Sequence, residues 1–194
     1  MVPKKTEGLK AEKARVLGAS ICAELNKNKT EDVVVKALSK NDASLFLVEG
    51  LALANYQFLK YFKDKEAKSN SLKNIFVEDK NITASKIDEM WNVVDATFKA
   101  RDWVNEPLSY LTAEQLANEF EMMGVEANVK VEVLDQVKIE TLKMGGLLAV
   151  NQGSLDPATF TIMEWKPKNA KNKKPIVLVG KGCLLYTSPS PRDA

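Results

Sequence analysis

Short apolar runs alternate along the chain with longer stretches of helical periodicity, and this alternation constrains the fold more than any other feature. A helical pattern over residues 9–25 precedes a predicted strand over residues 32–38, which holds three consecutive valines. A second helical pattern precedes another short predicted strand at residues 75–77. Strands that alternate with helices are typical of α/β folds, in which helices cover a mainly parallel sheet. The sequence therefore predicts the α/β class with a mainly parallel sheet.

Two long helices are predicted in the first half of the chain. Asn41 or Asp42 can cap a helix that runs through Phe62, and Thr83 begins another that stops before Pro107. In the first of these helices, the residues expected to face the protein core are Phe46, Leu51, Phe58 and Phe62. Those expected to share one face of the second are Ile87, Trp91, Val94 and Phe98.

The second half begins with a capping box, because the Thr112 hydroxyl can accept from the amide of Gln115 while that side chain reaches back. A helical stripe follows, with Gly124 expected just after the helix end. Alternating valines predict a strand over residues 129–133, followed by a short helix to Leu142. The apolar runs 147–150 and 159–165 are predicted to be two more strands, and Gly145 and Gly146 a tight helix-to-strand connection.

The segment Pro175-Ile-Val-Leu-Val-Gly-Lys-Gly182 is predicted to be a buried strand that ends in a lysine between two glycines. Ligand groups in α/β sheets lie just past the carboxyl ends of strands, which is where Lys181 falls. This is not a nucleotide-binding phosphate loop, because Pro175 replaces the first glycine and Gly182 replaces the magnesium-binding hydroxyl residue. Taken alone, the tripeptide is more typical of a solvated turn.

The tail 183–194 follows neither helical nor strand periodicity. One back-translation of residues 183–193 resembles a transposon-type sequencing-library adapter. We therefore hypothesise that these residues are adapter-derived and exclude them from the fold. Resequencing that finds genuine genomic continuation through these codons would reject the hypothesis.

Composition limits the classes of function that the sequence supports. The chain of 194 residues has a formal charge of +2, which gives no reason to infer a nucleic acid or a membrane as partner. No segment approaches the ~20 apolar residues that span a bilayer. The two cysteines cannot make a disulfide framework, which fits the cytoplasm. The absence of histidine excludes a Ser-His-Asp triad and a histidine-ligated zinc site.

Three segments together point to a known family. They are Arg101-Asp-Trp-Val-Asn-Glu-Pro-Leu-Ser-Tyr-Leu-Thr112, Lys143-Met-Gly-Gly-Leu-Leu-Ala-Val-Asn-Gln-Gly-Ser154 and Lys174-Pro-Ile-Val-Leu-Val-Gly-Lys-Gly182. In order and spacing they resemble the cytosol or leucyl aminopeptidase family of two-metal peptidases. A weaker similarity over residues 49–61 extends the resemblance to most of the chain up to Gly182.

This resemblance implies a particular division of the chain. Residues 1–81 would form an incomplete macrodomain-like α/β domain, and residues 82–104 a connecting helix. Residues 105–182 would begin an α/β catalytic metallopeptidase domain, and 183–194 would be the adapter-derived tail. The resemblance also implies further strands ahead of Leu9, so Met1 is expected to be an internal methionine of a longer frame. The catalytic domain is expected to be truncated after Gly182.

The resemblance makes Lys181 a metal ligand, in a centre that holds two divalent ions, zinc or manganese, in full-length members. A lysine ligates as a neutral amine, so its pKa would have to fall from ~10.4, which a neighbouring dication favours. No catalytic residue is assigned, because the remaining ligands and the catalytic arginine follow this lysine in the family, and Cys183 departs from that pattern.

The activity implied is the release of amino-terminal residues, leucine above all, from peptides by water activated between two metals. The substrates would be peptides and the full-length assembly a homo-hexamer. With Lys181 alone, this chain is expected to bind metals poorly and to be inactive.

The alternative is a non-catalytic binding or assembly module based on the macrodomain-like half, for example for a nucleotide-like ligand. No glycine-rich phosphate loop supports it. A calorimetric titration with ADP-ribose that gives no heat would remove this alternative. The basic run 166–174 is predicted to be a solvated loop.

Overall fold

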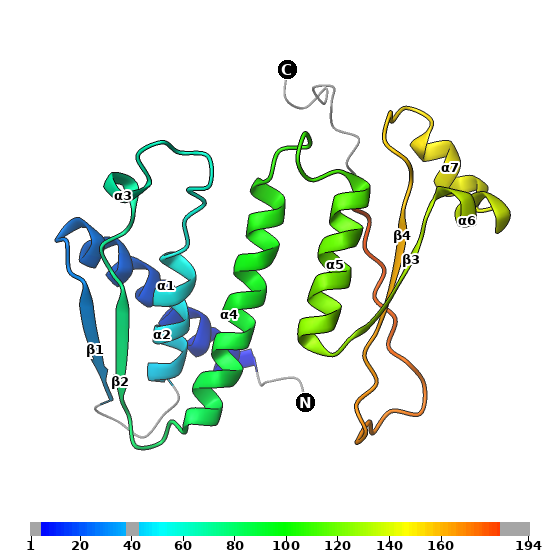
Figure 1. The fold of residues 1–194 in the computed structure, drawn as a ribbon. Coiled ribbons are helices and arrows are strands. Elements are labelled where there is room, and N and C mark those ends of the chain that lie inside the picture. Colours follow the sequence, from blue (N-terminus) through cyan, green and yellow to red (C-terminus); the bar gives the residue numbers. More distant parts are fainter. Residues whose placement is uncertain (1–4, 38–42, 183–194) are drawn as a thin grey trace. The chain divides into compact units, whose positions relative to one another are not determined.

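The computed structural model describes residues 5–37 and 43–182. It divides into two compact units, residues 1–105 and 106–194 (Figure 1). Helices and strands occur in both units, so the protein has a mixed α/β structure. No helix in the described ranges is long and apolar enough to cross a bilayer.

The first unit is built from helices that accompany one pair of parallel strands. Its elements are α1 (Lys5–Lys27), β1 (Asp32–Lys36), α2 (Ala43–Ala54), α3 (Lys65–Lys68), β2 (Asn74–Glu78) and α4 (Ala84–Asn105). In the register of the pair, Val34 lies opposite Phe76. The predicted helix over 9–25 is confirmed by α1, and the strands predicted over 32–38 and 75–77 are confirmed by β1 and β2. Residue 38, the predicted end of the first strand, lies outside the described residues. The macrodomain-like character of this region remains a prediction.

The core of the first unit lies between the strand pair and the helices. One cluster comprises Val48, Ala52, Met90 and Val94. A second comprises Cys22, Leu51 and Leu72. Inward-facing valines and isoleucine of β1 and β2 pack against both clusters, which is the alternation expected of a sheet with one covered face.

Two core predictions for this unit are wrong. Trp91 leaves 53% of its surface exposed, because Met90 and Val94 are the residues of α4 that turn toward the core. Helix α2 ends at Ala54 rather than at Phe62, so Phe62 lies outside it and is exposed. The proposed caps Asn41 and Asp42 lie outside the described residues.

Side-chain hydrogen bonds of Asn55 account for the early end of α2. The Asn55 amide nitrogen donates to the Leu72 carbonyl (2.9 Å), and its amide oxygen accepts from Asn26 and Asn70 (both 3.0 Å). Asparagine competes with helical backbone in this way. The chain therefore leaves the helix to join α1 and the approach to β2.

The second unit contains an antiparallel strand pair flanked by helices. Its elements are α5 (Ala113–Ala127), β3 (Lys130–Leu134), α6 (Gln136–Thr141), α7 (Gly145–Asn151) and β4 (Phe160–Glu164). Strand β3 pairs with β4, with Val131 opposite Met163. The strands predicted over 129–133 and 159–165 are confirmed, but this pair is antiparallel, so the described strands are not mainly parallel.

The caps of α5 differ partly from the capping-box prediction. The Thr112 hydroxyl accepts from the Gln115 amide at 3.2 Å, but the Gln115 side chain donates to Glu119 instead of reaching back. Gly124 lies inside the helix, which Asn128 ends in a left-handed conformation at φ 53°. An added Cβ at Gly124 would overlap Val131, so the glycine allows close packing of α5 on β3.

The predicted strand 147–150 is wrong, because these residues form α7. A short apolar run is compatible with either a strand or a buried helix. Here Leu147 and Leu148 pack together on the cluster of Leu134, Ile139 and Ala158. Gly145 and Gly146 form the first turn of α7 rather than a connection to a strand.

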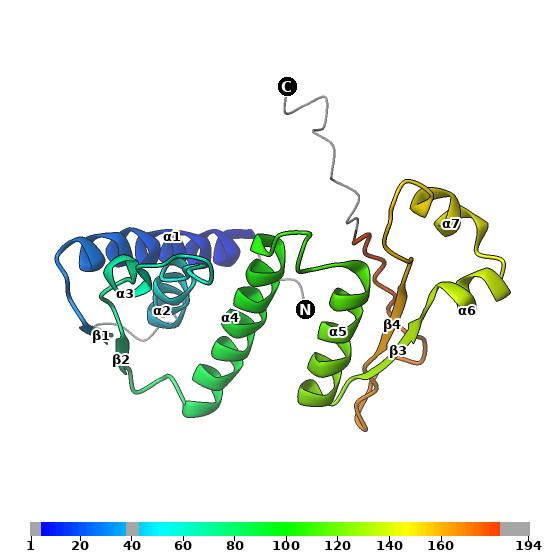
Figure 2. The ribbon, with the colours of Figure 1, turned by 45° about the horizontal axis from the view of Figure 1, so that its top comes forward.

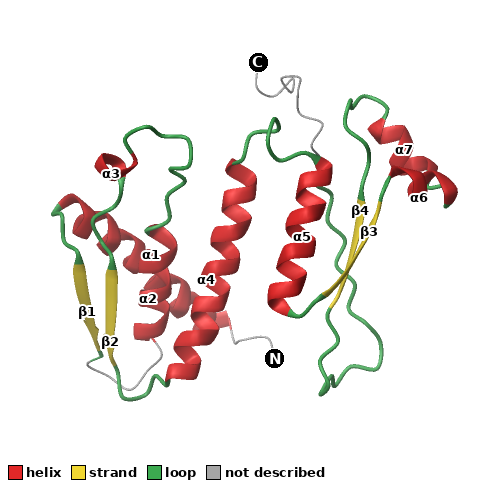
Figure 3. Cartoon of the chain, viewed as in Figure 1, coloured by secondary structure: helices red, strands yellow, loops and turns green. Residues whose placement is uncertain are grey.

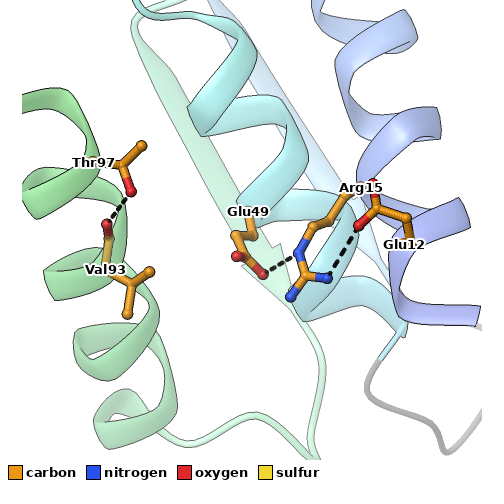
Figure 4. A network of polar contacts seen from close by, with 5 residues as sticks. All are labelled: Glu12, Arg15, Glu49, Val93 and Thr97. Carbon is orange, nitrogen blue, oxygen red and sulfur yellow. Dashed lines mark hydrogen bonds and ion pairs between the residues drawn. The ribbon is translucent and has the colours of Figure 1, made fainter. Parts of the chain in front are cut away.

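Helices α1 and α2 cross with their backbones in direct contact (Figure 2). A Cβ added at Gly18 would overlap the Leu47 carbonyl, and one added at Gly50 would overlap the Arg15 backbone. Beside the crossing, the Arg15 guanidinium donates to Glu49 at 2.9 Å (Figure 4). Glycine at both positions is therefore what allows this approach.

We expect Gly18→Ala and Gly50→Ala each to lower the free energy of unfolding by about 1–3 kcal/mol, because the added methyl must displace backbone. The matched control is Gly8→Ala on α1, where nothing lies within 4 Å of the added carbon. That variant should be unchanged or stabilised by up to ~1 kcal/mol through helix propensity. Urea denaturation followed by circular dichroism measures all three, and equal stability of Gly50→Ala and Gly8→Ala would contradict the close crossing.

Candidate functional site

Lys181, the predicted metal ligand, lies in an exposed extended segment that is not a strand (Figure 3). The four apolar residues 176–179 leave between 73% and 92% of their surface exposed. A strand needs a hydrogen-bonded neighbour, and among the described residues β4 pairs with β3 alone. The prediction of a buried strand is therefore wrong for this structure. Gly182 lies beside α5, where a Cβ added to the glycine would be 3.5 Å from Leu116 Cδ2.

The described residues do not complete a metal centre around Lys181. No group of three or more histidine, cysteine, aspartate or glutamate side chains able to hold an ion occurs within residues 5–37 and 43–182. A single exposed amine is a poor ligand for a divalent ion, because water competes for the ion and protons compete for the amine. The donors present in this part of the chain therefore do not fit a two-metal site.

The Arg101-Asp-Trp-Val-Asn105 motif forms polar contacts at the end of α4. Asp102 accepts from the Tyr56 hydroxyl at 2.7 Å, and the Asn105 amide donates to the same hydroxyl oxygen at 3.1 Å. Arg101 donates to the Leu53 carbonyl near the end of α2 at 2.6 Å, and its guanidinium carbon lies 5.4 Å from the centre of the Tyr56 ring. The side chains of Tyr56, Arg101, Asp102 and Asn105, the Tyr56 cluster, therefore fasten α4 to the end of α2.

The electrostatics of this cluster favour a protonated tyrosine. Burial raises the pKa of Tyr56 above its ordinary value of 10.0, and the hydrogen bond to Asp102 raises it further. The hydrogen bond from Asn105 and the charge of Arg101 act in the opposite direction. The phenol therefore stays a donor at neutral pH. Sequence reasoning used this motif for the family resemblance and missed its contacts. The visible signal was the spacing of Asp102 and Asn105, which lie three positions apart and therefore on one helix face.

A hollow of the second unit lies away from Lys181, among residues of α5, β3 and β4. It has a volume of about 630 Å³ and is lined by the end of α5 and by β3 and β4, including Glu121, Lys130, Glu164 and Lys166. Charges of both signs line it, and it holds no cluster of acidic metal ligands within the described chain. Its composition does not indicate a catalytic centre.

Comparison with known proteins identifies the class. Residues 98–187 match the family described as "Cytosol aminopeptidase family, catalytic domain". The match includes the last third of α4, the Arg101 motif and Lys181. Its last residues, 183–187, lie in the tail that we interpret as adapter-derived. The chain is related to the cytosol aminopeptidases, and its segment 98–187 belongs to their catalytic-domain family.

Individual relatives are also named as cytosol aminopeptidases. A "Probable cytosol aminopeptidase" of Clostridium tetani is 36% identical over 146 residues, covering 73% of this chain and 30% of the relative. One of Clostridium perfringens is 33% identical over 195 residues, covering 95% and 39%. One of Chlorobaculum parvum is 55% identical over 83 residues, covering 43% and 16%. The chain thus spans well under half the length of these relatives.

Solved structures share the fold. A tomato leucine aminopeptidase mutant matches with a TM-score of 0.68 at 20% identity, covering 76% of this chain and 32% of that one. The bottromycin maturation enzyme BotP in complex with Mn matches with a TM-score of 0.67 at 21% identity, covering 80% and 34%. At this identity the likeness concerns the fold alone. The resemblance inferred from the three sequence segments is confirmed by the family match and the named relatives.

For the Tyr56 cluster, we expect Tyr56→Phe and Asp102→Ala each to destabilise the protein, with a coupling of about 0.5–1.5 kcal/mol between them, because they share one hydrogen bond. A double-mutant cycle by urea denaturation measures the coupling. Strict additivity of the two changes would show that this hydrogen bond does not hold α4 in solution.

The pH dependence of this coupling follows from the raised pKa of Tyr56. A group whose pKa is higher in the folded state stabilises fully below its unfolded pKa, and the stabilisation is lost as the pH rises through the folded pKa. The coupling should therefore be constant up to about pH 10 and decline above it. A coupling that declines between pH 7 and pH 9 would contradict this assignment.

Proposed function

We propose that this chain is part of a metal-dependent aminopeptidase that releases amino-terminal residues, leucine above all, from peptides. The observation that carries the proposal is the match of residues 98–187 to the catalytic-domain family, because Lys181 and the Arg101 motif lie within it. The names of the relatives support the same activity. A fold likeness alone would be weak support for a reaction, since one fold serves many functions.

Lys181 is proposed as one metal ligand in the complete enzyme. Its place between two glycines, within the matched segment, supports this role. The metals would be zinc or manganese, and one structural neighbour is described as a complex with Mn. Because the described residues hold no group of three or more acidic, cysteine or histidine side chains able to bind an ion, we assign no catalytic step to them.

The domain organisation and the setting of the enzyme are also proposals. Residues 1–81, 82–104 and 105–182 would be the partial amino-terminal domain, the connecting helix and the beginning of the catalytic domain. The name cytosol aminopeptidase supports a cytoplasmic location. A homo-hexamer of the complete enzyme rests on the family resemblance.

The purified 194-residue chain should not hydrolyse leucyl p-nitroanilide in excess manganese or zinc, because the described residues form no cluster of further metal ligands to act with Lys181. The same metals should leave its melting temperature unchanged, and Lys181→Ala should behave identically. A preparation from cells with the empty vector is the background. Hydrolysis above this background that a chelator abolishes would contradict the expectation.

The activity itself is tested on the source gene. The locus is sequenced across the codons for residues 181–194, and any longer product is expressed and assayed on leucyl peptides. In that product Lys181→Ala should lower kcat/KM at least ~10-fold, the loss typical of disturbed metal sites. Lys168→Ala, in the exposed basic run, is the matched control and should leave it unchanged. A longer product without peptidase activity, or a confirmed stop after Ala194, would reject the proposal for this polypeptide.

A further inference from the structure

A loop between α2 and β2 exposes aromatic rings among lysines, and nothing in the proposed peptidase uses it. We call residues 58–68, which include α3, the aromatic loop (Figure 1). Tyr61 is 56% exposed and Phe62 45% exposed. Four lysines accompany them, Lys60, Lys63, Lys65 and Lys68, against two acidic residues, Asp64 and Glu66. Exposed aromatic rings therefore alternate with lysines in this loop. This local excess of positive charge cannot be seen from the net charge of the whole chain, which is close to zero.

The base of this loop is held by hydrogen bonds on both sides. The Gln57 side chain donates to the Lys68 carbonyl at 3.0 Å and accepts from the Asn70 amide at 2.6 Å. Asn70 in turn donates to the Asn55 carbonyl at 3.1 Å. The side chains of Gln57 and Asn70, which flank the loop, therefore hold its two ends together. Compact surface loops whose ends lie close together are frequently functional. The rings are therefore presented from a defined base.

Inside the loop, each exposed ring has a lysine over it. The Lys60 ammonium lies 5.5 Å from the centre of the Tyr61 ring, and the Lys68 ammonium lies 4.8 Å from the centre of the Phe62 ring. The Phe58 and Tyr61 rings are 5.8 Å apart and tilted by 58°. Each exposed ring thus offers an apolar face and, within a few ångströms, a positive charge.

We propose that the aromatic loop binds single-stranded nucleic acid. Bases stack on aromatic side chains irrespective of sequence, and lysines contact the neighbouring phosphates. Each aromatic ring with its neighbouring ammonium group can contact one nucleotide, the ring through the base and the ammonium through the phosphate. On binding, the lysines leave the rings for the phosphates, and the bases take their place on the ring faces. Tyr61 and Phe62 thereby provide two stacking positions.

The basic run 166–174 provides the internal comparison. Its five lysines are exposed, and no aromatic residue lies within it. If charge alone attracted a polyanion, this run would bind more strongly than the aromatic loop. If stacking is required, the aromatic loop should dominate. The two surfaces therefore separate the stacking contribution from general electrostatic attraction.

The test is fluorescence anisotropy of a labelled oligothymidylate of about 12 nucleotides, a length within the usual range of single-strand sites. The probe is titrated with the 194-residue chain at several salt concentrations. Tyr61→Ala and Phe62→Ala should each weaken binding roughly 5- to 160-fold, the range for loss of one stacked base. Tyr61→Phe keeps the ring and should bind like the parent. Melting by circular dichroism verifies that each variant is folded.

Charge is tested by two matched double variants. Lys60→Ala with Lys68→Ala should lower the dependence of log K on log salt by about 1.4, at ~0.7 per phosphate contact on a single strand. Lys168→Ala with Lys171→Ala removes the same charge from the basic run and should leave the affinity within about twofold, because that run offers no ring for stacking.

Four outcomes would overturn the proposal: no binding of the oligonucleotide at low salt, equal affinity of the ring-deleted variants and the parent, an equal loss in both lysine pairs, or binding to vesicles of anionic lipid but not to the oligonucleotide. The last would indicate a membrane surface instead. None of these outcomes depends on peptidase activity, so the proposal stands or falls separately from the proposed function.

Discussion

The close crossing of α1 and α2 is the contact on which the first unit depends. Gly18 and Gly50 let the two backbones touch, and the Arg15–Glu49 ion pair lies beside that point. The crossing places Cys22 and Leu51 in one cluster with Leu72, on the covered face of the strand pair. A two-stranded sheet is marginal by itself and requires such a packed helical layer. The strand pair of this unit is therefore stabilised by packing against α1 and α2. These two helices approach closely only because Gly18 and Gly50 have no side chains.

Polar contacts then determine where the helices end. The Asn55 side chain draws the chain away from α2 by hydrogen bonding to two other segments, α1 and the approach to β2. The Tyr56 cluster joins the end of α4 to the end of α2. Among the described residues, every buried side-chain nitrogen or oxygen has a hydrogen-bond partner, as protein interiors require. The same network closes the base of the aromatic loop, so the exposed rings are a consequence of how α2 ends. The hydrogen bonds of Asn55 that end α2 therefore also help to hold the base of the aromatic loop.

The family match indicates the class of the domain, whereas the geometry at Lys181 shows which metal ligands the described residues bring together. The match over residues 98–187 identifies the kind of catalytic domain to which the segment belongs. The described residues around Lys181 supply an exposed lysine and an unpaired apolar segment, without further metal ligands. A metal centre requires several donors that converge from different elements. Membership of the family can therefore be recognised from one segment, whereas the chemistry depends on ligands that this segment does not contain.

The strongly periodic elements and their local caps follow from the amino-acid sequence, and the remaining elements depend on tertiary contacts. Helix α1, helix α4 up to Pro107, strands β1 to β4 and the Thr112 cap were predictable, because period and capping depend on near neighbours. The lysine between two glycines, taken together with two other segments, also identified the family. By contrast, residues 147–150 form a helix because Leu147 and Leu148 find a core cluster, and α2 stops early because Asn55 finds distant partners. In both of these cases a short or ambiguous pattern has two local solutions of similar energy, and contacts with residues far away in the sequence select one of them.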